Sequence, residues 1–509
     1  VMRATQNSET STDGFGWSYN HAAMLVYWNG RFYADYLSDP VSEHLPPSQT
    51  LIAWSDNGAN WSRPVVLFPP MEAPSAPYTG PNAEELTNDT VACVMHQRVS
   101  FYVTKDNHLL ATGFYGIAPN HGIAPNNGYG VGRVVREIYE DNTFSDIYPH
   151  FNIAYSYKTN YIPKLCKIVK ELGGYAEVVS EMELELALRV GNKPENIIWN
   201  GPIKNPEIMT DFILSGGTVN IDSADEAAFI ESIAKANTDK ILNIGIRCNY
   251  DVGDGVISRF GFDVNGNDFK TVLGIVSDNA NIYLKNFHCH FAKRQLDYWP
   301  ARAKGMLDTV TSSGIIPDRI DIGGGLFGKM PESLKSQFSC KIPSYADYAE
   351  SSAKFFADYF KDKPKKPELL IEPGSAIVGD CMKFVCTVKT IKNVRGKYFA
   401  SVLGSQKNIS MSGVNPPLEV VNLSDSAKDY TDIDFVGFTC IEGDVIYHNY
   451  CGKVAEGDMI AIGNCGSYSV VMKPPFILPN FPVIDISEGG IELIKRKENF
   501  DDLFHTFCF

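Results

Sequence analysis

The chain has 509 residues, 44% of them hydrophobic and 21% charged, which is the composition of a globular protein long enough for roughly two to four domains. Its formal net charge of -15 argues against a nucleic-acid partner, because phosphate binding requires clustered Lys and Arg side chains. No stretch reaches the roughly 18 apolar residues that a membrane span requires. The 11 cysteines show neither a disulfide framework nor zinc-finger spacing, so we expect reduced thiols, a cytoplasmic location and no metal site.

Residues 1–145 predict an all-β segment. They are rich in Trp, Tyr, Asn, Gly and Pro, with short apolar runs such as 23–27 and 65–68. Turn signals recur between the runs, including Asp56-Asn57-Gly58 and Asn126-Asn127-Gly128. This pattern is typical of short antiparallel strands joined by tight turns.

The segment from Trp54 to Trp61 is similar to the Asp box of sialidase-like β-propellers. Asp56, Gly58 and Trp61 keep the spacing of the box, whereas Trp54 stands where Ser or Thr is usual. The box is a structural hairpin, so the resemblance implies architecture and not hydrolase activity. A segment of this length makes about two or three four-stranded blades, too few to close a propeller. We therefore predict an incomplete propeller-like segment.

From residue 146 onward, apolar strands alternate with amphipathic helices. The pattern predicts helices at 161–172, 182–190 and 225–236, and strands at 151–155, 175–179, 196–199, 218–221, 241–248, 282–290, 319–322 and 368–371. Eight such units predict a (β/α)8 TIM-type barrel over residues 146–380, with its chemistry at the strand ends. Past residue 380, strands expected at 385–392, 398–402, 444–447 and 459–462 predict a C-terminal β domain over residues 381–509. The predicted fold class is α/β plus β.

Lys158 ends the first barrel strand, in Ala154-Tyr155-Ser156-Tyr157-Lys158-Thr159-Asn160. Partial burial at a strand end favours the neutral amine, which attacks an aldehyde. Taken alone, a solvated lysine at the end of a strand is the simpler interpretation.

Five further motifs carry chemical groups. Gly323-Gly324-Gly325 follows a buried strand and lets backbone amides approach an anion. Glu372-Pro373-Gly374 offers a carboxylate to a pyridinium nitrogen, and His288-Cys289-His290 offers a ring that stacks on a flat cofactor. In the β domain, Cys440-Ile441-Glu442-Gly443-Asp444 supplies a thiol and two carboxylates, and Gly466-Ser467-Tyr468 supplies a phenol. Each has a plainer structural interpretation as a turn or a core residue.

In their order along the chain, these motifs resemble the ornithine/diaminopimelate decarboxylase family, a fold-type III barrel plus β domain that binds pyridoxal 5'-phosphate (PLP). The resemblance covers residues 147–509. The matches are Tyr-Ser-Tyr-Lys-Thr-Asn at 155–160, Ser-Arg-Phe-Gly at 258–261, His-Cys-His at 288–290, the glycines at 323–325, Glu-Pro-Gly at 372–374, the Cys–Asp box at 440–444 and Gly-Ser-Tyr at 466–468.

The resemblance implies a role for each matching residue. Lys158 would hold PLP as a Schiff base, Glu372 would meet the pyridinium nitrogen and His290 would stack on the ring. Glu177 and Arg247 would lie beside the cofactor. The residues that would bind the phosphate are Gly323, Gly324, Gly325 and Tyr468.

The family forms head-to-tail homodimers with shared active sites. By this resemblance Cys440 would enter the active site of the other subunit and protonate the carbanion left by decarboxylation. Asp444 would contact the distal amine of the substrate, and Glu442 is a second acidic candidate for substrate binding.

Three departures from the family pattern place the substrate in doubt. Ser375 replaces the usual Arg after Glu-Pro-Gly. Phe291-Ala292-Lys293 replaces a small residue and a serine after the stacking histidine, and Lys293 is a candidate for supplying charge to the phosphate. Ile441 separates the acid at Glu442 from Cys440.

The strand and helix that normally precede the lysine strand are missing, so we expect the barrel to close and the β domain to lack a strand. Two incomplete modules fit an accidental fusion or an assembly artefact as well as an evolved bifunctional protein. The predicted function is PLP-dependent decarboxylation of a basic or diamino L-amino acid such as diaminopimelate or ornithine. The alternatives are an amino-acid racemase of the same fold and a non-enzymatic glycan-binding fusion with a degenerate PLP domain.

Overall fold

The computed structural model describes residues 19–39, 48–69, 71–72, 93–118, 130–139, 150–411, 413–421, 424–473, 475–487 and 490–509. The chain divides into two compact units, one of residues 1–149 and 485–492 and the other of residues 150–484 and 493–509. The expected turn at Asn126-Asn127-Gly128 lies outside the described residues. None of the helices in the described ranges has the length and apolar character needed to cross a membrane.

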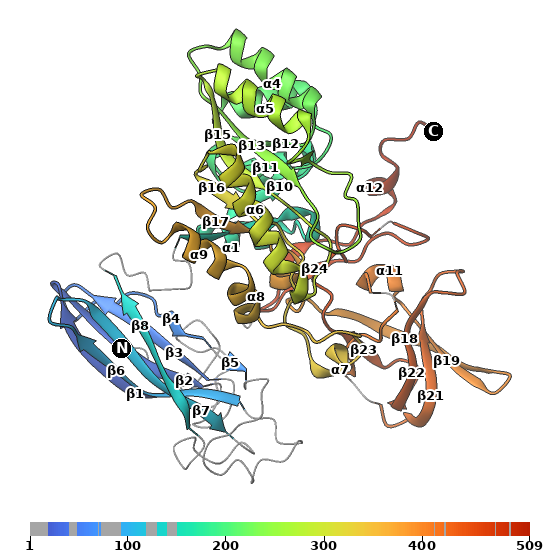
Figure 1. The fold of residues 1–509 in the computed structure, drawn as a ribbon. Helices are drawn as coiled ribbons and strands as arrows, with labels where there is room; N and C mark the ends of the chain where they lie inside the picture. Colours follow the sequence, from blue (N-terminus) through green and yellow to red (C-terminus); the bar gives the residue numbers. More distant parts are fainter. Residues whose placement is uncertain are drawn as a thin grey trace. The chain divides into compact units, whose positions relative to one another are not determined.

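The first unit contains two four-stranded antiparallel sheets, each a simple meander, in the blue to cyan part of Figure 1. One sheet has the order β1-β2-β3-β4 and the other β5-β6-β7-β8. The strands are β1 (Tyr19–Trp28), β2 (Arg31–Asp39), β3 (Gln49–Ser55), β4 (Val65–Phe68), β5 (Met71–Glu72), β6 (Cys93–Val103), β7 (Leu109–Ala118) and β8 (Gly130–Ile138). Every hydrogen-bonded neighbour in these two sheets is also a neighbour in the sequence.

The turn expected at Asp56-Asn57-Gly58 is present between β3 and β4. Gly58 has a φ of +70°, and its N–H donates to the Ser55 hydroxyl at 2.9 Å. The Trp61 indole donates to the Gly58 carbonyl oxygen at 3.2 Å. Buried apolar side chains from both sheets, such as Tyr33, Ile52 and Leu109, form one core.

Eight parallel strands close into a barrel in the second unit, which confirms the predicted fold class. The ring runs β9-β10-β11-β12-β13-β15-β16-β17 and returns to β9 through the pairing of Ile371 with Ile153. The strands are β9 (Phe151–Ser156), β10 (Tyr175–Val178), β11 (Ile197–Trp199), β12 (Thr218–Ile221), β13 (Leu242–Asn249), β15 (Ile282–His288), β16 (Arg319–Asp321) and β17 (Glu368–Ile371); β14 (Phe262–Asp263) extends the sheet beside β13.

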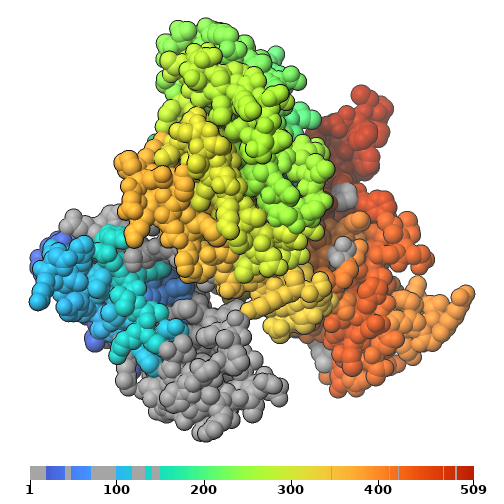
Figure 2. Space-filling model, viewed as in Figure 1, coloured from blue at the N-terminus to red at the C-terminus, as the bar shows by residue number. Residues whose placement is uncertain are grey.

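Helices connect the strands and cover their outer side, and Figure 2 shows this helical surface on one face in green and yellow. The helices are α1 (Pro163–Glu171), α2 (Glu181–Arg189), α3 (Pro206–Leu214), α4 (Ala224–Ala236), α5 (Asn267–Asp278), α6 (Trp299–Ser313), α7 (Glu332–Lys335), α8 (Tyr345–Ser351), α9 (Ala353–Phe360) and α10 (Ser375–Val378). Local signals set their ends: Ser180 and Ser223 cap α2 and α4 by accepting backbone N–H groups, and Gly314 ends α6 with a φ of 69°.

The C-terminal part of this unit is a six-stranded sheet with the order β20-β23-β18-β19-β21-β22. Its strands are β18 (Phe384–Val394), β19 (Lys397–Val402), β20 (Leu418–Val420), β21 (Lys428–Val436), β22 (Val445–Val454) and β23 (Met459–Ile462). The remaining elements are α11 (Gln406–Ile409), the paired strands β24 (Val483–Asp485) and β25 (Glu492–Lys495), and α12 (Phe500–Phe504). The sequence pattern missed β20 and β21 and shortened β22, whose pairing with β21 is interrupted by bulges.

Candidate active site

Lys158 lies where β9 ends, in a single 3-10 turn. Tyr157 and Thr159 on either side of it are buried, whereas the Lys158 side chain is 33% exposed. Its Nζ forms an ion pair with Glu177, which is fully buried on the neighbouring strand β10. The pairing of Glu177 with Ser156 puts both residues at the same level of the barrel. The turn therefore presents one amine beside one buried carboxylate.

The charge of Lys158 differs from the sequence-based expectation. Burial alone lowers the pKa of Lys158, but the carboxylates of Glu177 and Glu372 outweigh it and raise the pKa above its ordinary value. The expected neutral amine is therefore wrong for the free protein. The carboxylates come from other strands, so their effect is invisible in the sequence around the lysine.

Glu372 follows β17 and is almost fully buried. One carboxylate oxygen lies 3.2 Å from His288 Nε2, and the other lies 3.2 Å from His290 Nδ1. Although burial by itself raises the pKa of Glu372, His288 and Lys158 hold that pKa well below its usual range. Glu372 is thus an ionised carboxylate at the base of the site.

Asp321 ends β16 and faces Glu372. Burial, and then repulsion by Glu372, raise the pKa of Asp321 well above its usual range. Of the two acids, Glu372 is the one whose surroundings favour the ionised form, and Asp321 is the one whose surroundings favour the neutral form.

His288, Asp321 and Glu372 place possible metal-ligand atoms within 4.8 Å of one another. Sequence spacing did not link these residues, but they come from the adjacent strands β15, β16 and β17. Asp321 already accepts the Gly323 N–H at 2.8 Å, and its raised pKa disfavours the ionised form that a cation needs. This set fits the hydrogen-bonded floor of an organic cofactor site better than a metal centre.

Three asparagine side chains form a buried chain of hydrogen bonds that ends at the carboxylates. Asn286 Nδ2 donates to Asn220 Oδ1 at 3.1 Å, and Asn220 Nδ2 donates to Asn200 Oδ1 at 2.6 Å. Asn200 Nδ2 then donates to Glu177 at 2.9 Å and to Glu372. Ionised carboxylates only accept hydrogen bonds, so Asn200 must turn its N–H2 group toward them. Each of the other two asparagines then donates to the side-chain oxygen of the asparagine that precedes it in the network.

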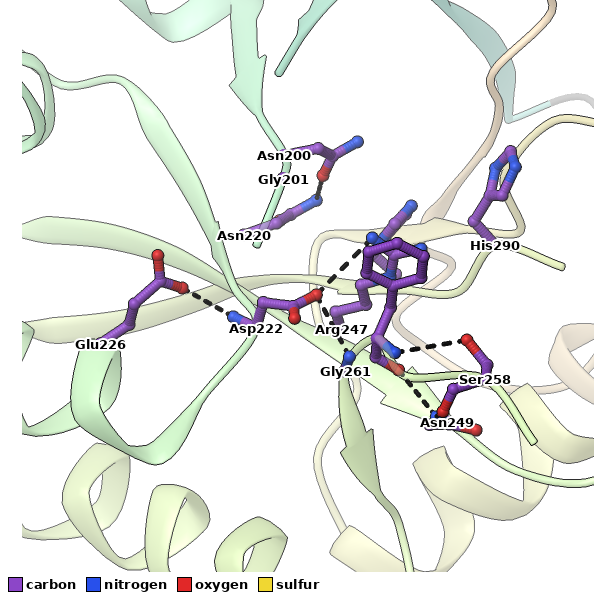
Figure 3. A network of polar contacts seen from close by, with 12 residues as sticks. Asn200, Gly201, Asn220, Asp222, Glu226, Arg247, Asn249, Ser258, Gly261 and His290 are labelled. Carbon is purple, nitrogen blue, oxygen red and sulfur yellow. Dashed lines mark hydrogen bonds and ion pairs between the residues drawn. The ribbon is translucent and has the colours of Figure 1, made fainter. Parts of the chain in front are cut away.

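Figure 3 shows Asn200 and Asn220 facing each other from neighbouring strands. A Cβ at Gly245 on β13 would lie 1.7 Å from Asn220 Oδ1, so the missing side chain makes room for this amide. We did not identify these asparagines from the sequence. The sequence did contain a sign of them, because Asn220 and Asn286 are polar residues within the otherwise apolar strands β12 and β15.

Arg247 lies on the opposite side of the site, where it packs against the loop that leads to β14. Its guanidinium is 3.6 Å from Asp222 and 4.6 Å from the ring centroid of Phe260 (Figure 3). Asp222 also accepts the Gly261 N–H at 3.1 Å, and Asn249 Nδ2 donates to the Ser258 and Phe260 carbonyl oxygens. The Ser-Arg-Phe-Gly segment is therefore held at the barrel mouth by β12 and β13.

The glycine run forms a tight turn against His290. Gly323 and Gly325 have φ values of +72° and +87°, which side chains rarely adopt. A Cβ at Gly324 would lie 2.4 Å from the Glu372 carbonyl oxygen. The Gly324 N–H donates to His290 Nδ1 at 3.1 Å. Burial lowers the pKa of His290, so a neutral ring stands beside the turn.

Gly466-Ser467-Tyr468 reaches the same site from the β domain. Asn160 Nδ2 donates to the Gly466 carbonyl oxygen at 2.8 Å, and the Tyr468 N–H donates to the Thr159 carbonyl oxygen at 2.8 Å. Tyr468 has a φ of 60°, a strained conformation for a non-glycine residue. The backbone next to Lys158 thus fixes the position of this tyrosine.

The Cys440–Asp444 segment does not join this group. Within the described residues, Cys440, Glu442 and Asp444 form no hydrogen bond or ion pair with Lys158 or Glu372. Cys440 is exposed. Asp444 is buried, and its carboxylate accepts hydrogen bonds from Ser405, Gln406 and Thr439 of its own domain (the shortest, from Thr439 Oγ1, is 2.6 Å).

Two family models match the chain. Residues 1–167 match the family described as BT_1020-like, N-terminal beta propeller. Residues 135–379 match the family described as pyridoxal-dependent decarboxylase, pyridoxal binding domain. The two matches agree with the all-β first unit and with the barrel that follows it.

Among curated proteins, the diaminopimelate decarboxylase of Aquifex aeolicus is 27% identical over 387 residues, covering 72% of this chain and 88% of the relative. The enzyme of that name from Archaeoglobus fulgidus is 26% identical over 373 residues, covering 69% and 85%. Among solved structures, AQ1208 from Aquifex aeolicus has a TM-score of 0.58 at 25% identity and covers 70% of this chain and 86% of that one. Diaminopimelate decarboxylase from M. jannaschii has a TM-score of 0.63 at 22% identity, covering 70% and 85%.

The residues present fit PLP. The amine of Lys158, the ionised Glu372, the neutral ring of His290 and a glycine turn too crowded for side chains match the aldehyde, ring nitrogen, ring face and phosphate of this cofactor. Residues 135–379 thus match the pyridoxal binding domain of pyridoxal-dependent decarboxylases, and the chain is a PLP-dependent amino-acid decarboxylase.

Proposed function

We propose that this enzyme decarboxylates a diamino L-amino acid of the diaminopimelate type and binds PLP through a Schiff base on Lys158. The observation that carries the proposal is the position of one amine beside Glu177 and Glu372 at the strand ends of a closed barrel. The names of the most similar relatives support the substrate class.

Each residue of the site has a defined task under this proposal. Glu177 takes up the proton that Lys158 must lose before its nitrogen can bond to an aldehyde carbon. Glu372 holds a proton on the pyridine nitrogen, because an ionised carboxylate stabilises the cationic ring. The neutral His290 ring lies against the flat face. Bound PLP supplies the electron sink that accepts the electrons released as carbon dioxide leaves.

Two acidic residues of the β domain, Asp444 and Glu442, are candidates for contact with the distal amine of the substrate. Asp444 is buried, and its hydrogen bonds are made within its own domain, so it is poorly placed to receive an amine. Glu442, two residues from Cys440, is exposed. We therefore assign the distal amine to Glu442 and proton return to Cys440, both acting in the site of a second copy in a homodimer.

The test starts from the visible absorbance of PLP bound to the purified chain. Lys158→Ala should remove this band and all carbon dioxide release, while Lys167→Ala, an exposed lysine on α1, should leave both unchanged. Circular dichroism should show that both variants are folded. Equal spectra for Lys158→Ala and the unaltered protein would overturn the assignment of the Schiff base.

The substrate class is tested separately by carbon dioxide release from diaminopimelate, lysine, ornithine and arginine, each supplied alone. We expect diaminopimelate to be the best substrate. Loss of optical activity without carbon dioxide would instead identify a racemase. Release from none of the diamino acids, with PLP bound normally, would refute the substrate class but not the cofactor.

A further inference from the structure

Arg302 is a fully buried cation on α6. Its helix packs Trp299, Ala303 and Met306 into the same interior, where each is fully buried. The guanidinium lies 4.2 Å from the centroid of the Trp299 ring and 5.7 Å from that of Phe291. Burial lowers the pKa of Arg302, but an arginine keeps its charge in proteins.

The guanidinium connects two segments of the cofactor site. Arg302 NH1 donates to the carbonyl oxygens of Ile322 at 3.1 Å and Gly324 at 2.6 Å. Arg302 NH2 donates to those of Phe291 at 2.9 Å and Lys293 at 3.4 Å. One side chain therefore ties the glycine turn to residues 291–293, the segment that departs from the family pattern. A Cβ at Gly325 would lie 3.2 Å from the Phe291 carbonyl oxygen, so the two backbones are in direct proximity.

Within the described residues, no carboxylate forms an ion pair with this charge, although Glu372 interacts with it electrostatically. The Arg302 guanidinium forms hydrogen bonds there only with carbonyl oxygens. A buried charge is normally paired with an opposite charge. The guanidinium thus places a positive charge without an ion-pair partner behind the two segments, which favours an anion there.

The same contacts orient the backbone amides. In a planar trans peptide, the carbonyl of one residue and the N–H of the next point in opposite directions. Because the carbonyls of Gly324, Phe291 and Lys293 point at Arg302, the N–H groups of Gly325, Ala292 and Arg294 point away from it. None of these three N–H groups has a hydrogen-bond partner within the described ranges. They are donors available to a ligand.

We propose that Arg302 is the positioning residue of the phosphate cradle. It holds the N–H groups of Ala292, Arg294 and Gly325 toward the phosphate of PLP. It also supplies a positive charge in a chain that has Ser375 where the family pattern has Arg. The inference rests on the proposed function, since it takes PLP as the ligand. Arg302 itself stays behind the backbone and acts through the two segments.

The test compares PLP with pyridoxal, which has the aldehyde and the ring but no phosphate. The dissociation constant of each is measured by visible absorbance for the full chain and its variants. Arg302→Met should weaken PLP binding by roughly 10- to 100-fold and leave pyridoxal binding within about twofold. Arg302→Lys, which keeps a charge but cannot reach four carbonyls, should lose less.

Met306→Ala is the matched control, because it removes a buried side chain from the same helix one turn later. It should lower stability without changing the ratio of PLP to pyridoxal affinity. An unchanged ratio in folded Arg302→Met would overturn the proposal. Absence of the visible band with both compounds in the unaltered protein would instead refute the function proposed above.

A measurement on the unaltered protein covers the case in which both Arg302 variants fail to fold. Hydrogen exchange of peptides spanning residues 291–294 and 323–326 should slow on addition of PLP and should stay fast with pyridoxal. Equal exchange with the two compounds would refute the orientation of these amides toward the phosphate.

Discussion

The two units of this chain pair their strands in opposite ways. In the first unit every strand bonds to a strand next to it in the sequence, so β1 to β4 and β5 to β8 are formed by local hairpins. In the second, β9 closes the barrel by pairing with β17, more than 200 residues further along. Local pairing repeats one motif, whereas barrel closure collects side chains from distant parts of the chain at one rim.

Buried acids illustrate the consequence. In the barrel, Glu177 and Glu372 are surrounded by an amine, amides and imidazoles from other strands. In the first unit, Asp35 on β2 is fully buried, and neither of its oxygens has a hydrogen bond within the described residues. Burial raises the pKa of Asp35 to about 8. The surroundings of Glu372 thus favour its ionised form, while burial of Asp35 favours its neutral form.

The largest effect on activity is expected from removing the negative charge of Glu372. Glu372→Gln should lower the rate of carbon dioxide release by roughly 10²- to 10³-fold, the usual size of one lost preorganised electrostatic contact. The visible band should remain, because Lys158 is untouched. Steady-state kinetics and absorbance spectra of the same preparation measure both. A loss below about threefold would contradict the role of Glu372 as the partner of the ring nitrogen.

A smaller effect on activity is expected from displacing the hydrogen-bonded asparagines Asn200, Asn220 and Asn286 without removing any of their polar groups. Gly245→Ala would place a Cβ 1.7 Å from Asn220 Oδ1, so the amide must move. We expect an activity loss of roughly tenfold and a stability loss of about 1–3 kcal/mol. The control is Gly274→Ala on α5, where a Cβ meets no atom within 4 Å. Equal behaviour of the two variants would show that the amide chain has no influence on the site.

The stability of the first unit should depend on pH through Asp35. The folded-state pKa of Asp35 is raised from 3.8 to about 8, so the folded form retains a proton that the unfolded form releases. Stability of this unit should therefore fall as pH rises from about 4 to about 8. Asp35→Asn mimics the neutral form and should recover on the order of 3 kcal/mol at pH 8 but much less at pH 5.

Calorimetry at the two pH values measures this effect, with hydrogen exchange assigning the transition to residues 19–139. Asp56→Asn, the same substitution at an exposed acid of this unit, is the control for the chemical change itself. A gain for Asp35→Asn that is the same at pH 5 and pH 8 would rule out titration of this acid as the cause.

No effect is expected from metal removal. His288, Asp321 and Glu372 have the composition of a cation site, but the raised pKa of Asp321 opposes metal binding. Dialysis against EDTA should leave both the visible band and carbon dioxide release unchanged. A loss of activity that a divalent cation restores would identify this cluster as a metal centre. It would contradict the interpretation of these three residues as part of an organic cofactor site.

Much of the fold could be predicted from the sequence because its signals are local. The period of apolar residues, the capping serines Ser180 and Ser223 and the glycine that ends α6 act over a few neighbouring residues. The eight barrel strands were therefore located to within one or two residues. The rule that barrel chemistry gathers at the strand ends also selected Lys158, His290 and Glu372, and the family resemblance added Glu177. These residues lie together in the structure.

The sequence alone thus determined the order of the elements and the residues that reach the barrel mouth. Only the tertiary structure decided the charge of Lys158, the alignment of Asn200, Asn220 and Asn286, and the attachment of Arg302 to two distant segments. These features depend on strand register and on which side chains face one another across the barrel. Electrostatic interactions and hydrogen bonds depend on distance in space, and residues far apart in the sequence carry no local sign that they will meet.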